Sequence, residues 1–298
     1  MKILVVSGFL GAGKTTFIEK LVEKVNKKIA VLENEYGQVG VDGDLLKKDK
    51  MNIWEMTEGC ICCSMKSDFA SSVLTISNTI DPDILVVEPT GVGLLSSVIK
   101  NIQKVSYDRI KLLEPITIVD PLCVDRYIKE YKDIFTDQIV NSNQIVISKV
   151  SNLQTTFLDE IVKKVQNINP KAKIDCFDYS KYTDDDWVNF TKNLIEKNDF
   201  DSSVNFQKLQ IESIGFTDVT FKDLYTFESY MSAIMRGDFG DVIRAKGFLP
   251  INNAWAKFDI VNKTYTLTHI DDMKESKIIL IGKNLDKEKL KILFSNNK

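Results

Sequence analysis

Three cysteines, Cys60, Cys62 and Cys63, fall within four consecutive positions of this 298-residue chain, in the segment EGCICC. Three thiolates at this spacing can ligate a zinc ion and leave a fourth coordination position open, which suits exchange of the metal with another protein. Glu33 is a candidate oxygen ligand for the same metal. Buried free cysteines and a redox switch are the alternative interpretations of the segment.

A second group of residues can bind phosphate. Residues 7–16 read SGFLGAGKTT and satisfy the P-loop pattern G-x-x-x-x-G-K-[ST]. In such a loop the glycines let backbone N–H groups converge on phosphate oxygens, Lys14 reaches the β- and γ-phosphates, and Thr15 holds Mg²⁺. The predicted nucleotide contacts of this loop are Gly8, Gly11, Ala12, Gly13, Lys14, Thr15 and Thr16.

Two carboxylates are candidates for the chemistry at the γ-phosphate. Glu88 ends an apolar stretch in PDILVVEPTGVG, and Gly91 three residues later can donate its N–H to the γ-phosphate. Asp42 lies in the acidic, glycine-containing segment 32–46 and can join the Mg²⁺ shell; an acidic turn is the equally weighted alternative. We therefore predict Lys14, Glu88 and Asp42 as catalytic, with Thr15, Asp42 and Glu88 as Mg²⁺ ligands.

The residues expected to contact the base depart from the usual pattern. A guanine-recognition loop reads Asn-Lys-x-Asp, and its carboxylate accepts two hydrogen bonds from guanine. Here the corresponding positions are Ser148, Lys149 and Ser151, the first and last being serines. Because a serine hydroxyl cannot accept both bonds as a carboxylate does, guanine preference is weakened and ATP remains an alternative to GTP.

The elements that must position these residues alternate between strands and helices. Apolar runs at 2–6, 28–32, 52–56, 84–87 and 145–148 predict strands, and Phe17, Leu21 and Val25 have helical spacing. A helix from residue 64 would carry Phe69, Val73 and Ile76 on one face, so the cysteines precede a helix N-terminus, whose dipole favours thiolate. This order predicts an α/β P-loop NTPase domain with a mostly parallel sheet.

A second domain is expected after a polar linker. We predict a P-loop domain over residues 1–196, a linker over 197–206 and a smaller α+β domain over 207–298. Strands are expected at 206–216, 241–251, 255–270 and 277–282, with helices at 221–237 and 286–296. Trp255, Phe258 and Tyr265 are predicted to be core residues, and the single histidine, His269, a surface or hydrogen-bonded residue rather than a metal ligand.

Composition limits the class of protein. Apolar residues make up 44% and charged residues 27%, and the net charge of −3 gives no broad electrostatic footprint for nucleic acid. No apolar run approaches the roughly 18–20 residues of a membrane span, and the N-terminal stretch is expected to be a first strand rather than a signal peptide. We therefore expect a cytoplasmic protein with reduced thiols and neither nucleic-acid nor membrane partners.

Four motifs in order, GFLGAGKTT, ENEYGQVGVDGDLL, EGCICC and EPTG, resemble the CobW-type metallochaperone GTPase family, which includes zinc-transferase chaperones and activators of cobalt or iron enzymes. Residues 117–128 and 242–250 are also similar to family segments. The resemblance implies slow hydrolysis of GTP to GDP with Mg²⁺, and Zn²⁺, Co²⁺ or Fe²⁺ bound by the three cysteines and Glu33. It departs at Ser148 and Ser151, where the family has Asn and Asp, and in lacking a histidine-rich segment.

The predicted function is a nucleotide-gated metallochaperone that serves a client metalloprotein or cofactor-dependent enzyme. The cysteines fall between the segments at 32–46 and 88–91, which in P-loop switches respond to the γ-phosphate, so hydrolysis could gate metal capture or release. The alternatives are a P-loop kinase of a small molecule and a nucleotide-binding thiol redox regulator. The oligomeric state stays open, a nucleotide- or metal-dependent dimer being one option.

Overall fold

A computed structural model describes residues 1–34, 52–56, 66–106, 109–195, 211–261 and 263–295. These residues form two compact units, the first up to residue 195 and the second from residue 211. The predicted domain boundaries at 196/197 and 206/207 lie outside the described residues and stay a prediction.

The first unit is built on a parallel sheet. Its strands are β1 (Lys2–Gly8), β2 (Ile29–Asn34), β3 (Asn52–Met56), β4 (Ile84–Glu88), β5 (Lys111–Leu112), β6 (Ile116–Val119), β7 (Gln144–Ile147) and β8 (Lys173–Asp175). The order is β3-β2-β4-β1-β6-β7-β8, with β5 pairing β1, and these strand pairs are all parallel. The predicted α/β class with a parallel sheet is confirmed.

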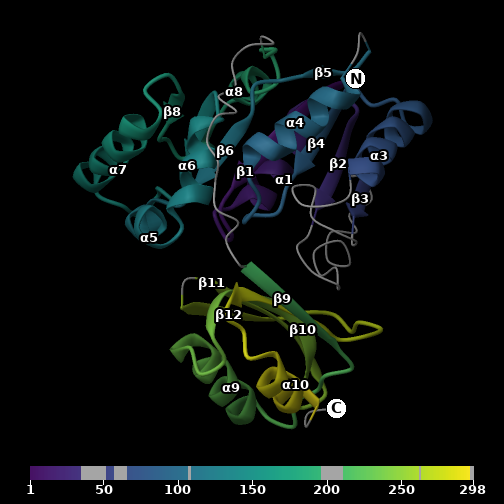
Figure 1. Ribbon diagram of the computed structural model, residues 1–298, viewed down its shortest axis with the longest axis vertical. Coiled ribbons are helices and arrows are strands. Elements are labelled where there is room, and N and C mark those ends of the chain that lie inside the picture. The colour runs from purple at the N-terminus through teal and green to yellow at the C-terminus, as the bar shows by residue number, and fades with distance from the viewer. Residues whose placement is uncertain (35–51, 57–65, 107–108, 196–210, 262, 296–298) are drawn as a thin grey trace. The chain divides into compact units, whose positions relative to one another are not determined.

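Helices flank this sheet (Figure 1). They are α1 (Lys14–Lys24), α3 (Lys66–Thr79), α4 (Leu95–Val105), α5 (Val124–Glu130), α6 (Lys132–Val140), α7 (Thr155–Ile168) and α8 (Asp184–Asn189), with short 3₁₀ turns η1 (Pro121–Cys123) and η2 (Tyr179–Lys181). The predicted apolar faces of the first two helices are buried. The start of the second helix, predicted at residue 64, lies outside the described residues, and α3 is described from Lys66.

The alternation of side chains along β1 explains why this strand is apolar throughout. Leu4 and Val6 enter a core shared with α1 and α8, whereas Ile3 and Val5 enter a separate core shared with α3 and α4. A strand covered on both faces needs apolar residues at every position. The strand therefore holds its carboxyl end, where the phosphate loop begins, rigidly between two packed layers.

The second unit is an antiparallel sheet with two helices. Its elements are β9 (Ile211–Thr217), α9 (Leu224–Arg236), β10 (Asp241–Ile251), β11 (Ala254–Val261), β12 (Thr264–His269), β13 (Lys277–Lys283) and α10 (Lys287–Ser295), with strand order β12-β11-β10-β13-β9. Phe227 of α9 and Phe294 of α10 share one core with Phe258 of the sheet, and both helices lie on the same side of it (Figure 1). The predicted α+β domain is confirmed, and His269 is exposed at the end of β12.

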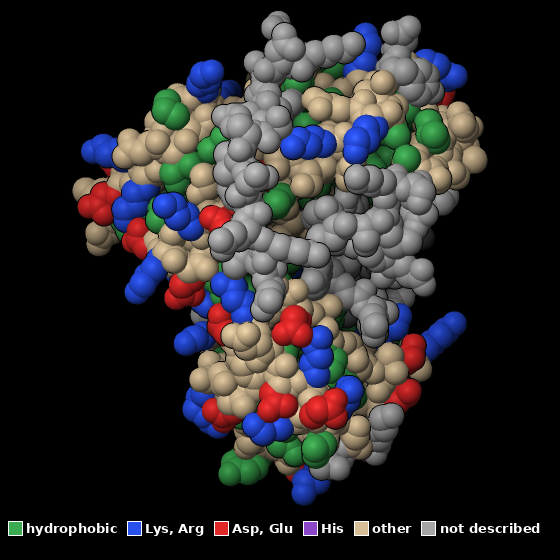
Figure 2. All heavy atoms as spheres, viewed as in Figure 1, with side chains coloured by type: hydrophobic (Ala, Val, Ile, Leu, Met, Phe, Trp, Pro, Cys, Tyr) green, Lys and Arg blue, Asp and Glu red, His purple; other side chains and the backbone are tan. Residues whose placement is uncertain are grey.

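Charged side chains are interspersed on the surface. On the face shown in Figure 2, Lys and Arg side chains lie among Asp and Glu side chains in both units, as the net charge of −3 suggests. Among the helices of the described residues, none has the length and apolarity needed to cross a membrane.

Candidate nucleotide site

The loop between β1 and α1 has the backbone of a phosphate-binding turn. Gly8, Gly11 and Gly13 have φ values of 140°, 72° and 100°, in the left-handed region that glycine tolerates best. A Cβ on Gly8 would lie 2.3 Å from the Ile118 carbonyl oxygen of β6, so only glycine fits there. Gly13 is the N-cap of α1, which places the loop at a helix N-terminus suited to an anion.

Lys14, Thr15 and Glu88 come together at the carboxyl ends of β1 and β4. Lys14 is buried, and its Nζ donates to the Phe9 carbonyl (3.3 Å) and lies 3.9 Å from Glu88 Oε1. Thr15 Oγ1 donates to the same carboxylate at 3.2 and 3.3 Å. A hydroxyl and a carboxylate are oxygen donors of the kind Mg²⁺ prefers, so Thr15 and Glu88 fit as ligands of that ion. Thr16, on the same helical turn, is exposed.

The turn after β4 is packed against the P-loop. A Cβ on Gly91 would lie 2.6 Å from the Leu10 backbone nitrogen, so the two backbones touch at this point. Gln138 of α6 is completely buried and its Nε2 donates to the carbonyls of Gly91 and Gly93, each at 3.2 Å. Sequence reasoning missed Gln138 because a single glutamine in a helix belongs to no motif.

The carboxyl end of β7 holds the P-loop from the other side. Ser148 is completely buried and its Oγ donates to the carbonyls of Ala12 (2.7 Å) and Val119 (3.2 Å). Lys149 has a φ of 56°, and its Nζ donates to the Gly11 carbonyl (2.8 Å) and to Asp120 Oδ2 (2.7 Å). Ser148 and Lys149 therefore hold the P-loop by hydrogen bonds to the carbonyls of Ala12 and Gly11.

Asp120 is a second residue that the sequence analysis did not assign. It follows β6, its side chain is almost fully buried, and it pairs with Lys149. The signal that could have found it is an acidic residue directly after an apolar strand, the pattern that identified Glu88.

Ser151, predicted to contact the base, lies beside an acidic residue from the loop after β8. Its Oγ donates to Asp178 Oδ2 at 3.0 Å. The hydrogen bonds from Ser180 and Ser151 lower the pKa of the Asp178 carboxyl below its usual value, so this group is ionised at neutral pH. The structure thus places the Asp178 carboxylate next to Ser151, the residue that stands where the usual recognition loop has Asp.

The predicted metal site is described only at its border. Glu33 is buried in β2, in register with Glu88 of β4 and with Glu55 of β3. The cysteine segment is bracketed by Met56, which ends β3, and Lys66, which begins α3. Cys60, Cys62, Cys63 and Asp42 lie outside the described residues, and within the described ranges no group of three or more His, Cys, Asp or Glu side chains could hold a metal ion.

Comparison with known proteins identifies the family. Residues 2–175 match the CobW/HypB/UreG nucleotide-binding domain. The chain belongs to the CobW/HypB/UreG family. Residues 211–297 additionally match the C-terminal domain of the cobalamin synthesis protein cobW. The residues of the site built from β1, β4 and β7 lie within this matched domain, and the resemblance noted from the four motifs is confirmed.

Similar proteins of this family carry names that refer to zinc. The zinc chaperone YjiA of Escherichia coli is 24% identical over 98% of this chain and 97% of its own length. The zinc-regulated GTPase metalloprotein activator 1 of Schizosaccharomyces pombe is 24% identical over 95% of this chain and 82% of its own. Among solved structures, the Zn(II)-bound YjiA GTPase from E. coli aligns with 100% of this chain and 99% of its own, at 21% identity and a TM-score of 0.49.

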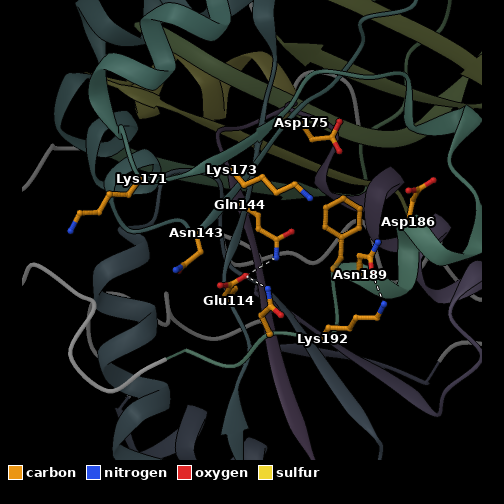
Figure 3. Close-up of a pocket in the computed structure, with 11 residues that line it drawn as sticks. Glu114, Asn143, Gln144, Lys171, Lys173, Asp175, Asp186, Asn189 and Lys192 are labelled. Carbon is orange, nitrogen blue, oxygen red and sulfur yellow. Dashed lines mark hydrogen bonds between the residues drawn. The ribbon is translucent and has the colours of Figure 1, made fainter.

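A polar hollow at the other edge of the sheet does not belong to this site. It measures about 440 Å³ and lies where β7 and β8 begin, whereas the P-loop follows the end of β1. Figure 3 shows Glu114 in this hollow, and its Oε2 accepts hydrogen bonds from Gln144 and Asn193, both at 3.1 Å. Its lysines and acids come from loops, from strand ends and from α8, and they form no phosphate cradle.

Proposed function

We propose that this chain is a metallochaperone that hydrolyses GTP to GDP and phosphate and delivers a divalent metal, zinc in the first place, to a client metalloprotein. The observation that carries the proposal is a register: Glu33 of β2 pairs with Glu88 of β4, which holds Thr15 of the P-loop. The proposed metal ligand and the proposed nucleotide residue are thereby neighbours at the carboxyl ends of two adjacent strands. The zinc named in the relatives' descriptions supports the choice of cargo.

The nucleotide half of the proposal assigns roles to residues that lie together. Lys14 neutralises charge on the β- and γ-phosphates, and Thr15 and Glu88, with Asp42, hold Mg²⁺ or orient the attacking water. Mg²⁺, when held by these residues, would neutralise negative charge on the phosphates during hydrolysis. The backbone of Gly91 contacts the P-loop at Leu10. Loss of the γ-phosphate can therefore change the conformation of the turn that follows Glu88.

The metal half assigns Cys60, Cys62, Cys63 and Glu33 as zinc ligands. Thiolates are needed for zinc binding, and a cytoplasmic setting keeps them reduced. The segment that carries the cysteines starts at the end of β3, next to β2 in the sheet, so ordering of the nucleotide loops can change the metal geometry. The small-molecule kinase and the thiol redox regulator have no support from the family match.

The test compares zinc affinity across nucleotide states. Zinc binding is measured by competition with a chelator for apo, GDP-bound and GTP-analogue-bound protein, together with phosphate release from GTP. Cys62→Ser with Cys63→Ser should lower zinc affinity at least roughly 100-fold, because two of three thiolates are lost, and leave GDP affinity unchanged. Cys176→Ser, a half-buried cysteine of the described part, is the matched control and should bind zinc normally.

Either of two results would contradict the proposal. Unchanged zinc affinity in the double variant would show that Cys62 and Cys63 are not zinc ligands. Equal zinc affinity in all three nucleotide states would show that the nucleotide does not control zinc binding, even if the protein binds both zinc and nucleotide.

A further inference from the structure

The predicted base-recognition loop, residues 148–151, lacks the aspartate that ends the usual Asn-Lys-x-Asp pattern. Guanine presents two donors, N1–H and the 2-amino group, which one carboxylate can accept together. Ser151 stands at this position, and its hydroxyl is already engaged as a donor to Asp178 Oδ2 at 3.0 Å. The hydroxyl therefore points at a carboxylate that comes from a different part of the chain.

Asp178 is held firmly and keeps acceptor capacity. It is the N-cap of η2, where its Oδ1 accepts the Ser180 backbone N–H at 3.0 Å and its Oδ2 accepts Ser151. A carboxylate has about four lone-pair positions, so the hydrogen bonds from Ser180 and Ser151 leave acceptor capacity for a ligand. Capping alone would need only Oδ1, and it does not account for the bond from Ser151.

The segment of Asp178 also lies against the phosphate loop. A Cβ on Gly13 would be 3.9 Å from the Tyr179 hydroxyl and 3.8 Å from Ser148 Cβ. The Tyr179 ring packs edge-on against Phe17 of α1, with centroids 6.0 Å apart. Lys149 reaches Gly11 of the same loop. Lys149, Ser151 and Asp178 therefore come together at one end of the P-loop, where a base attached to the bound phosphates would lie.

We propose that Asp178 is the specificity residue that accepts the N1–H and 2-amino hydrogens of guanine, and that Ser151 positions it. The carboxylate of the usual recognition loop is thus supplied from the loop after β8. This inference rests on the proposed function only in requiring that the P-loop site binds a nucleotide. It makes the chain guanine-specific despite Ser148 and Ser151.

Asp178→Asn is the sharpest variant, because asparagine also caps helices and keeps the bond from Ser180. Its amide offers one acceptor and one donor, which mismatches guanine but matches xanthine, whose position 2 is a carbonyl. Binding of GDP, ADP and xanthosine diphosphate with Mg²⁺ is measured by calorimetry. We expect GDP to bind roughly 10- to 100-fold more weakly, xanthosine diphosphate more tightly than in the wild type, and ADP unchanged.

A swap separates recognition from local structure. Asp178→Ser alone should lose the preference for GDP over ADP, and Asp178→Ser combined with Ser151→Asp should regain it, because the carboxylate returns to the other loop. Asp185→Asn removes an exposed acid of α8 and should bind all three nucleotides as the wild type does. Recovery in the double variant is not expected from a role confined to capping.

The outcomes that overturn the inference are distinct from those that overturn the metallochaperone. The inference is overturned if Asp178→Asn leaves the ratio of GDP affinity to ADP affinity unchanged. It is also overturned if the variant loses affinity equally for GDP and ADP and gains none for xanthosine diphosphate. Either result would mean that Asp178 only caps η2. Equal binding of GDP and ADP by the wild type shows that the base is not read. Zinc binding and phosphate release, which test the proposed function, do not depend on any of these results.

Discussion

Replacing Gly91 by alanine tests whether the turn after β4 and the P-loop act as one unit. The new Cβ would lie 2.6 Å from the Leu10 nitrogen and 2.9 Å from the Leu10 Cα. Both are backbone atoms, which cannot rotate away as the end of a side chain can. Since non-bonded carbon atoms prefer about 3.5–4.0 Å, the two loops must separate by roughly 1 Å.

The cost of this separation can be bounded. Overpacking that shifts backbone costs about 1–3 kcal/mol. If the closed arrangement of the two loops is the one that binds nucleotide, the whole cost falls on binding and lowers the affinity about 5- to 150-fold. GDP and a non-hydrolysable GTP analogue should both bind more weakly, because Leu10 belongs to the loop that is proposed to hold the β-phosphate.

The assay is calorimetric titration of both nucleotides with Mg²⁺, with thermal unfolding of the free protein alongside. Val92→Ala, at the adjacent and partly exposed position, is the control and should change affinity less than about twofold. The reasoning is refuted by a Gly91→Ala variant that binds both nucleotides as the wild type does. A loss of thermal stability without a loss of affinity would refute it equally, because the loops would then separate without consequence for the site.

Two further predictions concern α6. Gln138→Leu removes both hydrogen bonds to the carbonyls of Gly91 and Gly93, and urea unfolding should show a free energy of unfolding lower by about 1–3 kcal/mol. Gln103→Leu, at an exposed position of α4, is the control and should lower it much less. Equal losses in the two variants would contradict a stabilising role for the Gln138 hydrogen bonds. Burial raises the pKa of the Asp137 carboxyl, so the folded state retains a proton that the unfolded chain releases near pH 4, and stability is lost as pH rises through the folded pKa. Asp137→Asn cannot ionise, so its unfolding free energy, measured in urea between pH 4 and 8, should gain on the wild type as pH rises; a pH-independent difference would contradict this.

Local patterns in the sequence were enough to identify several elements and motifs. Phe17 and Leu21 in α1 and Phe69 and Val73 in α3 are buried as their helical spacing predicted. The P-loop was recognisable because strand, glycines, lysine and helix are consecutive, and the structure brings Thr15 to Glu88 as the nucleotide chemistry requires. The roles of these residues with bound nucleotide and metal stay predictions.

Interactions between distant segments were not predictable in the same way. Ser148 bonds Ala12, 136 residues earlier, and Gln138 bonds Gly91, 47 residues earlier. Each contact depends on which strands are neighbours, and the order β4-β1-β6-β7-β8 follows from packing of the whole sheet. No periodicity within one segment encodes that order.

The sequence by itself determined the α/β class, the phosphate loop and the family, because these depend on side-chain periodicity and on residues that are close neighbours in the chain. Only the tertiary structure decided that Lys149 pairs with Asp120 and that Ser151 meets Asp178. The physical reason is that parallel strands bring their carboxyl ends to one edge, so residues far apart in the sequence become a site only when the sheet has formed.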